Sequence, residues 1–157
     1  MSKRSEIVEH GSNYNWISEC EKLACRIRKR VLGHAVIHGG YLSQACSSAE
    51  VFSYLYEKGL KLGPSNGPLV PLPFSGTPSS NNSKHRSGME YNGPRQPEYD
   101  RFFLSPTHYA MTLYSVLIET CRLGQNGLEQ FNEDGSTVEM IGGEHSPGHE
   151  TNGGSFG

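Results

Sequence analysis

The sequence has few apolar residues and no long hydrophobic run. Hydrophobic residues make up 34% of the 157 positions, and no run of them is long enough to cross a bilayer. Positions 1–10 are charged and lack the apolar region of a secretory signal peptide. We therefore expect a soluble, cytoplasmic protein that makes no use of a membrane.

Cysteine is scarce, and its spacing excludes two common kinds of site. The four cysteines form no C-x-x-C pair, and no spacing of cysteine and histidine fits a zinc site. We expect reduced thiols that pack as small hydrophobes, most of them in helices. The cysteines are Cys20, Cys25, Cys46 and Cys121.

An excess of one charge is also absent. Fourteen Lys and Arg residues face sixteen Asp and Glu residues, which gives a formal net charge of -2. We interpret the one basic cluster, inside a helical pattern, as a solvated helix face. No nucleic-acid partner is expected, because no basic stripe runs along the chain. The cluster consists of Arg26, Arg28, Lys29 and Arg30.

Glycine and proline are plentiful by contrast, with 19 and 9 residues. Seven of the prolines fall between positions 62 and 99, where apolar periodicity is also missing. This stretch predicts a long loop, either functional or partly disordered. The expected layout is a flexible segment 1–14 followed by a partial domain, 15–157, that contains this loop.

Apolar spacing predicts two helices before the loop. Steps of three and four residues predict a helix from about Asn15 to Ala35, which Gly33 and then Gly39-Gly40 are expected to end. For the second helix we interpret Ser47-Ser48-Ala49-Glu50 as a capping box. Its apolar side is predicted to consist of Val51, Phe52, Leu55, Tyr56 and Leu60.

Another helix is predicted after the loop. The run 101–104 is apolar and indicates a strand stub or a buried approach to the helix. In Ser105-Pro106 the serine is the predicted N-cap and the proline the first helical residue. Positions 109–122 fill the helix, Gly124 is its predicted C-cap, and 127–131 is predicted to form one more turn. The packed side is predicted to be Leu113, Val116, Leu117 and Cys121.

Histidines supply the candidate chemistry. His108 lies in the first turn of the predicted helix, where free N–H groups favour an anion and an imidazole could donate to a phosphate. His145 and His149 have helical metal-site spacing, but Pro147 and Gly148 exclude a stable helix there. We expect a loop that presents imidazoles beside Gly153-Gly154, where backbone can approach a ligand closely, and no metal ligands.

Three segments, taken in order, resemble the motifs of the transketolase family. The first runs from Gly39-Gly40-Tyr41-Leu42-Ser43 to Leu55-Tyr56. The second, Asp100-Arg101-Phe102-Phe103-Leu104-Ser105-Pro106-Thr107-His108, is similar to Asp-Arg-Phe-x-Leu-Ser-Lys-Gly-His. The third, Pro147-Gly148-His149-Glu150-Thr151-Asn152-Gly153-Gly154-Ser155-Phe156-Gly157, is similar to Pro-Gly-x-Glu-x-x-x-Gly-Ser-Leu-Gly. The resemblance covers about residues 16–157.

The resemblance implies a fold and a reaction. The fold class would be α/β, and the chain would be the N-terminal helical part of a thiamine-diphosphate-binding domain with a doubly wound parallel sheet. Members of the family bind thiamine diphosphate through Mg2+ at a dimer interface. They move a two-carbon ketol unit between sugars or sugar phosphates, and the cofactor carries the difficult chemistry.

The resemblance also implies site residues. His108 matches the histidine near the cofactor and donor sugar, His145 loosely matches another active-site histidine, and His38 stands where relatives have one beside the glycine pair. Gly154, Ser155 and Phe156 match the cofactor-binding stretch. The Lys-Gly that precedes the second-motif histidine in relatives is replaced here by Pro106-Thr107, so we expect substrate handling to differ.

The family's Gly-Asp-Gly metal motif is not present in the 157 residues. The Mg2+ ligands are therefore expected outside this chain, which should be inactive alone and need a second copy or a C-terminal partner subunit. A truncated, non-catalytic remnant or partner-binding fragment is one alternative. Another is a related thiamine-diphosphate enzyme, such as a deoxyxylulose-phosphate synthase or a 2-oxo acid dehydrogenase component.

Overall fold

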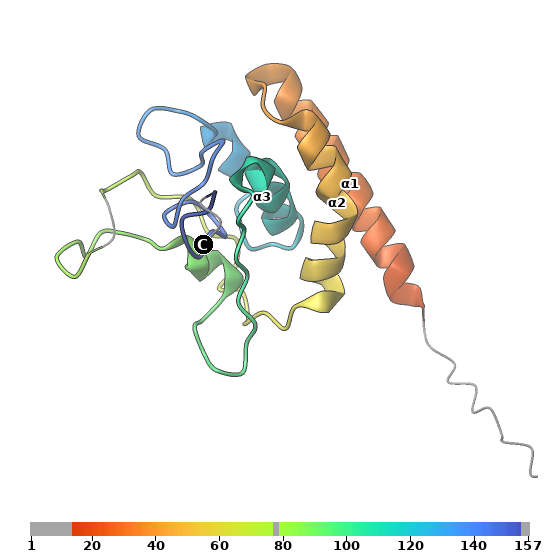
Figure 1. Ribbon diagram of the computed structural model, residues 1–157, viewed down its shortest axis with the longest axis horizontal. Helices are drawn as coiled ribbons and strands as arrows, with labels where there is room; N and C mark the ends of the chain where they lie inside the picture. The colour runs from red at the N-terminus through yellow and green to blue at the C-terminus, as the bar shows by residue number, and fades with distance from the viewer. Residues whose placement is uncertain (1–13, 77–78, 155–157) are drawn as a thin grey trace, which may run out of the picture.

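The protein is helical in the part that its structure, a computed structural model, describes: residues 14–76 and 79–154. Three α-helices dominate Figure 1. Among these residues no helix combines the length and the apolar character needed to cross a bilayer. The α-helices are α1 (Asn15–His38), α2 (Leu42–Tyr54) and α3 (Ala110–Glu119). Single turns are the π-helix η1 (Leu55–Gly59) and the 3-10 helices η2 (Gly88–Asn92), η3 (Thr107–Tyr109) and η4 (Gly127–Gln130).

Helices α1 and α2 form a hairpin around the glycine pair. Gly39 and Gly40 have φ values of 73° and 118°, a left-handed region that favours glycine. The N–H of Gly39 donates to the carbonyl of Ala35 at 3.0 Å and closes α1. The prediction that this pair ends the first helix is therefore confirmed, whereas Gly33 lies inside α1 and does not interrupt it.

The start of α2 differs from the prediction. The helix begins at Leu42, so the presumed capping box lies within it. The hydroxyl of Ser47 donates to the carbonyl of Gln44 at 3.0 Å, and Glu50 pairs with Arg28 of α1. The hairpin turn at the glycine pair already sets the helix start, so no capping box is needed. Val51, expected on the packed side, is 58% exposed.

Helix α3 is the centre of the core. Residues 110–118 are all buried, and α1 and α2 both pack against the helix. The packed positions Leu113, Val116 and Leu117 are fully buried, as the spacing predicts. Their burial contributes to the apolar packing that stabilises the core.

Both ends of α3 differ from the prediction. The 3-10 turn η3 precedes α3. The N-cap of η3 is Pro106 rather than Ser105, and no side chain forms a capping hydrogen bond there. The helix stops at Glu119 because Cys121 takes a φ of 57°, which ends the helical path before Gly124. Cys121 is consequently exposed and not packed.

The part of the chain covered by the structure contains no β-strand. One isolated parallel bridge joins Leu69 to Leu123, through bonds from the Leu69 N–H to Arg122 and from the Gly124 N–H to Leu69. The run 101–104 is extended without pairing as a strand, and its alternate residues Phe102 and Leu104 are buried, so it is a buried approach. A helical architecture fits part of an α/β domain; the sheet itself remains an expectation.

The proline-rich segment is tied to the region that follows α3. The hydroxyl of Thr137 donates to Leu72 at 3.0 Å, and the N–H of Phe74 donates to Gly135 at 2.7 Å. Further along, the N–H of Gly88 donates to Glu144 at 2.7 Å. These bonds link positions about 60 residues apart in sequence, so the described part of this loop packs against the C-terminal segment.

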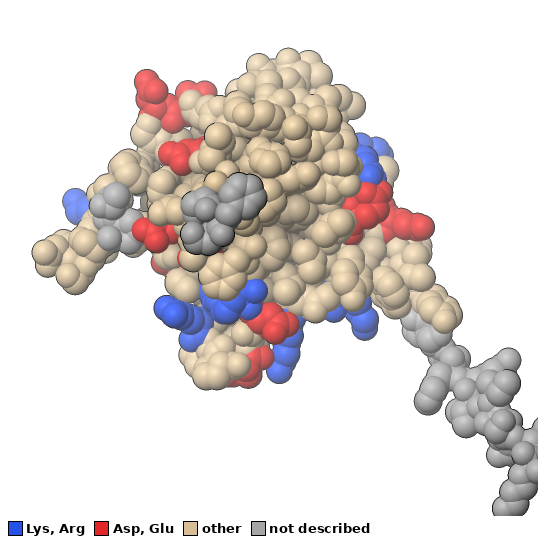
Figure 2. Space-filling view, viewed as in Figure 1, with Lys and Arg blue, Asp and Glu red and all other residues tan. Residues whose placement is uncertain are grey.

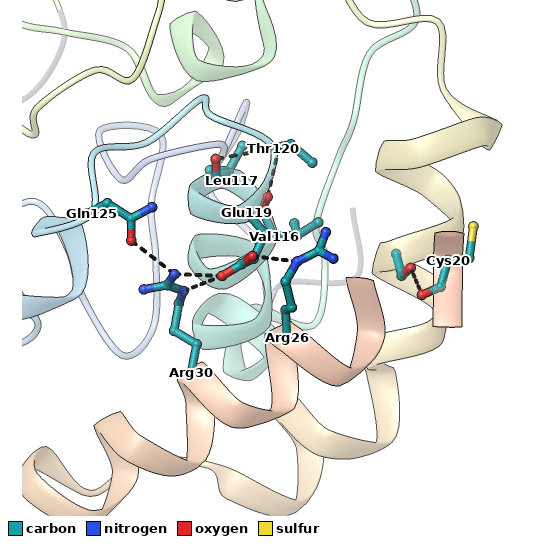
Figure 3. Close-up of polar contacts among 9 residues, drawn as sticks. Cys20, Arg26, Arg30, Val116, Leu117, Glu119, Thr120 and Gln125 are labelled. Carbon is teal, nitrogen blue, oxygen red and sulfur yellow. Dashed lines mark hydrogen bonds and ion pairs between the residues drawn. The ribbon is translucent and has the colours of Figure 1, made fainter. Parts of the chain in front are cut away.

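The basic cluster of α1 is used mainly for ion pairs between helices. In Figure 3 the guanidinium groups of Arg26 and Arg30 point to Glu119 at the end of α3, with nitrogen–oxygen distances of 2.8 and 2.6 Å. Arg30 also donates to Gln125 at 3.1 Å. In Figure 2 the Lys and Arg side chains lie interspersed with Asp and Glu. The charges of these two arginines thus join α1 to α3, while the side chain of Arg26 stays 50% exposed and that of Arg30 25% exposed.

Candidate functional site

The first and second motifs meet at the start of α3. The ring of Tyr41, directly after the glycine pair, lies 6.1 Å from the ring of His108 at an interplanar angle of 72°. A Cβ added to Gly40 would overlap the end of the Met111 side chain on α3. The glycine pair is therefore required for this close packing as well as for the turn.

The third motif meets the second at the same place. The N–H of Gly154 donates to the carbonyl of Ser105 at 2.7 Å. A Cβ on Gly153 would lie 2.5 Å from both the Leu104 carbonyl oxygen and the Thr107 methyl group, closer than real Cβ contacts allow. Gly154 has a φ of 87°. Only glycine lets these two backbone segments approach so closely.

His108 lies between these contacts. Its side chain is half-buried in η3, and its ring centroid is 4.6 Å from that of Tyr109. The turn leads directly into α3, so the imidazole is held at the N-terminal end of the buried helix. The chain therefore brings one member of each motif, Tyr41, His108 and Gly154, into a single region.

His38 lies at the end of α1, stacked on His34 with ring centroids 4.6 Å apart. No contact joins it to His108 among the residues described. His34 is buried beside Phe131, and its Nε2 has no hydrogen-bond partner there. Burial, together with the nearby His38, lowers the pKa of His34 to about 4. Sequence reasoning missed His34; its four-residue spacing from His38 was the available signal.

His145 lies against the proline-rich segment. Its Nε2 is 3.0 Å from the carboxylate of Glu139, and its ring is 4.9 Å from that of Phe74. The contacts found for it in residues 14–76 and 79–154 do not include His108. The structure thus places the two histidines in different surroundings, and it does not test the role implied for either one.

His149 and Glu150 are buried and serve the interior. Burial lowers the pKa of His149 to about 4, and its Nε2 has no partner. The carboxylate of Glu150 accepts bonds from Arg101 Nε at 2.6 Å, Asn92 Nδ2 at 2.9 Å and the Phe102 N–H at 3.1 Å. This buried carboxylate joins the proline-rich segment to the second and third motifs.

A second polar contact extends the cluster around Glu150. The hydroxyl of Tyr56 donates to the side-chain oxygen Oδ1 of Asn92 at 2.9 Å, and burial raises the pKa of that tyrosine. Arg122 donates to the carbonyls of Gly63 and Tyr91, and burial lowers its pKa. The side chains of Tyr56, Asn92 and Arg122 thus have hydrogen-bond partners, whereas the buried Nη1 of Arg101 has none among the described residues.

No group of three or more His, Cys, Asp or Glu side chains in the described ranges is arranged to hold a metal ion. The backbone of the third motif is described only as far as Gly154. The predicted cofactor-binding residues Ser155 and Phe156 lie outside the described residues. Their roles, and that of Gly154, stay predictions.

The chain resembles one curated protein over most of its length. No protein-family model matches it. It is 30% identical over 136 residues, 85% of the chain, to "Putative uncharacterized transketolase family protein y4mO" of Sinorhizobium fredii (strain NBRC 101917 / NGR234). The chain spans 39% of the length of that relative. At this identity and coverage the similarity gives weak support to a relationship with the transketolase family.

Proposed function

We propose that the chain supplies the N-terminal part of a cytoplasmic, thiamine-diphosphate-dependent enzyme of the transketolase type. The completed protein would transfer a two-carbon ketol unit between sugars or sugar phosphates. The observation that supports this proposal is the meeting of Tyr41, His108 and Gly154 at the start of α3. Three motifs separated by long stretches of sequence converge there, as residues of one site must.

The residues at this junction suit an anionic cofactor. His108 is half-buried and offers a ring nitrogen at the N-terminal end of a helical segment, where an anionic group is favoured. A Cβ added to Gly154 would meet the Thr107 hydroxyl at 3.7 Å, an ordinary van der Waals contact, so Gly154 lies beside the residue that precedes His108. Thiamine diphosphate, when bound, would supply the electron sink for making and breaking the carbon–carbon bond.

The remaining parts of such a site are proposed to come from other polypeptide. Mg2+ prefers oxygen ligands in an octahedral arrangement, and we propose that these ligands lie outside the 157 residues. A second copy of the chain or a C-terminal partner subunit would complete the site. His38 and His145 are proposed to act on the sugar substrate once the site is complete.

Isothermal titration calorimetry tests this proposal. The protein encoded by the complete reading frame that contains these residues is titrated with thiamine diphosphate in the presence of Mg2+. Saturable binding is expected, and His108→Ala should weaken it about tenfold, because a hydrogen bond to a charged group is lost. Lys22→Ala, at an exposed position of α1, is the matched control and should bind as the parent does.

Two outcomes would contradict the proposal. A folded protein that releases no binding heat would exclude the cofactor and favour a non-catalytic, partner-binding role. Equal affinity of the His108→Ala and Lys22→Ala proteins would show that the cofactor binds away from the junction of the three motifs. Circular dichroism of each variant establishes that it is folded.

A further inference from the structure

The proline-rich segment forms a cleft whose mouth is lined by none of Tyr41, His108 and Gly154, the residues at which the three motifs meet. Its mouth has a volume of about 610 Å³ between residues 72–75 and 83–86. A smaller recess of about 10 Å³ adjoins it and shares most of its lining. Tyr91, Thr137 and His145 line this recess, so the cleft lies between the segment and the region after α3.

The walls of the cleft are held by hydrogen bonds at several points. Thr137 fixes the carbonyl of Leu72, and Gly135 fixes the N–H of Phe74. On the opposite wall, a guanidinium nitrogen of Arg86 donates to the carbonyl of Val70 at 2.9 Å. A site that is already formed loses little conformational entropy when a ligand binds.

Polar and apolar groups lie on different sides of the cleft. Leu72, Pro73 and Phe74 form an apolar wall, and Lys84, His85 and Arg86 line the other side. The Nε2 atom of His85 is shielded from solvent yet has no hydrogen-bond partner in the described structure. A buried polar atom without a partner costs free energy, and a ligand oxygen or nitrogen would remove that cost.

The charges of the lining favour an anion. The Lys84 ammonium has no carboxylate within ion-pair distance among the described residues. The one carboxylate that lines the mouth, Glu90, lies 3.5 Å from Arg86 and offsets that charge. Lys84 therefore leaves one unbalanced positive charge beside the unpaired imidazole of His85. One unbalanced cation and no extended basic surface suit a small ligand rather than a nucleic acid.

We propose that this cleft binds a small organic phosphate ester. Its phosphate lies between Lys84 and His85, and its carbon body lies against Leu72 and Phe74. The lining joins an apolar surface, Leu72 to Phe74, to convergent polar groups, the two elements that small-molecule sites combine. Lys84 and His85 have no part in the proposed thiamine diphosphate site, although His145 lines the adjoining recess, and binding here requires neither that cofactor nor Mg2+.

Phenyl phosphate is a suitable probe because its two halves can be tested separately. The 157-residue chain, labelled with 15N, is titrated with phenyl phosphate, inorganic phosphate and phenol while amide chemical shifts are recorded. Phenyl phosphate should bind with a Kd of about 1 mM, a value reasonable for a ligand of this size. Shifts should concentrate at residues 72–75 and 83–86, and each half alone should bind at least about fivefold more weakly.

Two variants decide the assignment. Lys84→Ala should weaken phenyl phosphate binding about tenfold, since it removes the unbalanced charge, and His85→Ala should weaken it by a similar factor. Lys58→Ala, at an exposed position of η1, removes an equal charge elsewhere and should leave the Kd unchanged. Equal Kd values for Lys84→Ala and Lys58→Ala would overturn the proposal. So would the absence of chemical-shift changes in the parent protein at about 10 mM phenyl phosphate, ten times the expected Kd. The amide spectrum of each variant shows whether it is folded.

Discussion

The helical region and the loop region of this protein are stabilised in different ways. In the helical region, α1 to α3, the buried side chains are largely apolar, such as Ile27 and Leu113. In the loop region, residues 60–106 and 120–154, a buried carboxylate, Glu150, joins three segments through hydrogen bonds. A chain with 34% hydrophobic residues thus orders its long loops through satisfied polar groups as well as through apolar burial.

The largest expected effect is loss of the buried carboxylate. Glu150→Ala leaves Arg101 and Asn92 without their partner, and breaking a buried pair costs about 3–5 kcal/mol. Urea unfolding followed by circular dichroism measures the loss. Glu119→Ala, which removes the more exposed carboxylate between α1 and α3, is the matched control and should cost about 1 kcal/mol. Equal losses would remove the distinction between the two regions.

The next effect is a dependence of stability on pH. His149 in the loop region and His34 in α1 both have a pKa of about 4 in the folded protein, against 6.5 when exposed. The unfolded chain therefore binds more protons between these values. Stability is fully present above pH 6.5 and falls as pH drops toward 4, by about 3 kcal/mol for His149.

Urea unfolding at several pH values tests this dependence. His149→Leu removes the titrating group of the loop region and keeps a similar volume. The loss of stability between pH 6.5 and 4 should become smaller in this variant, and the remainder is assigned to His34. An unchanged pH profile would mean that the pKa of His149 is the same in the folded and unfolded protein.

A smaller effect is expected where the second and third motifs meet. Gly153→Ala places a methyl group 2.5 Å from the Leu104 carbonyl oxygen, and such overpacking costs about 1–3 kcal/mol. Thermal unfolding should therefore show a lower Tm. A Tm equal to that of the parent would show that the two backbone segments are not in contact.

The smallest effect should have the opposite sign. Gly33 lies inside α1 with nothing within 4 Å of an added Cβ. Gly33→Ala should raise the free energy of unfolding by about 0.5–1 kcal/mol, because alanine has the higher helix propensity. The same thermal scan measures this gain. A loss of stability would show that this part of α1 is not helical in solution.

The sequence predicts those parts of the fold that depend on local spacing. The periodicity of α1 and the two glycines after it identified the first helix and its end, because both signals come from neighbouring residues. The caps proposed at Ser47 and Ser105 were wrong. Their side chains fit a cap locally, but the glycine turn and the 3-10 turn η3 determine where α2 and α3 begin.

Contacts between distant segments could not be predicted in this way. The bonds from Asn92 and Arg101 to Glu150 span 58 and 49 residues, and no local pattern indicates them. Motif resemblance indicated that His108 and Gly154 belong together, and the bond from Gly154 to Ser105 places their segments side by side. The roles of these residues toward a cofactor stay predictions.

One measurement tests the central claim most directly. The complete protein, labelled with 13C and 15N, is titrated with thiamine diphosphate and Mg2+, and the ring resonances of His108 and the amide of Gly154 are followed. We predict that both shift along the same saturation curve, whereas the exposed control Lys22 does not shift. Saturation of cofactor binding without movement of either signal would contradict the account, because the motifs would then meet at a place that the cofactor does not occupy.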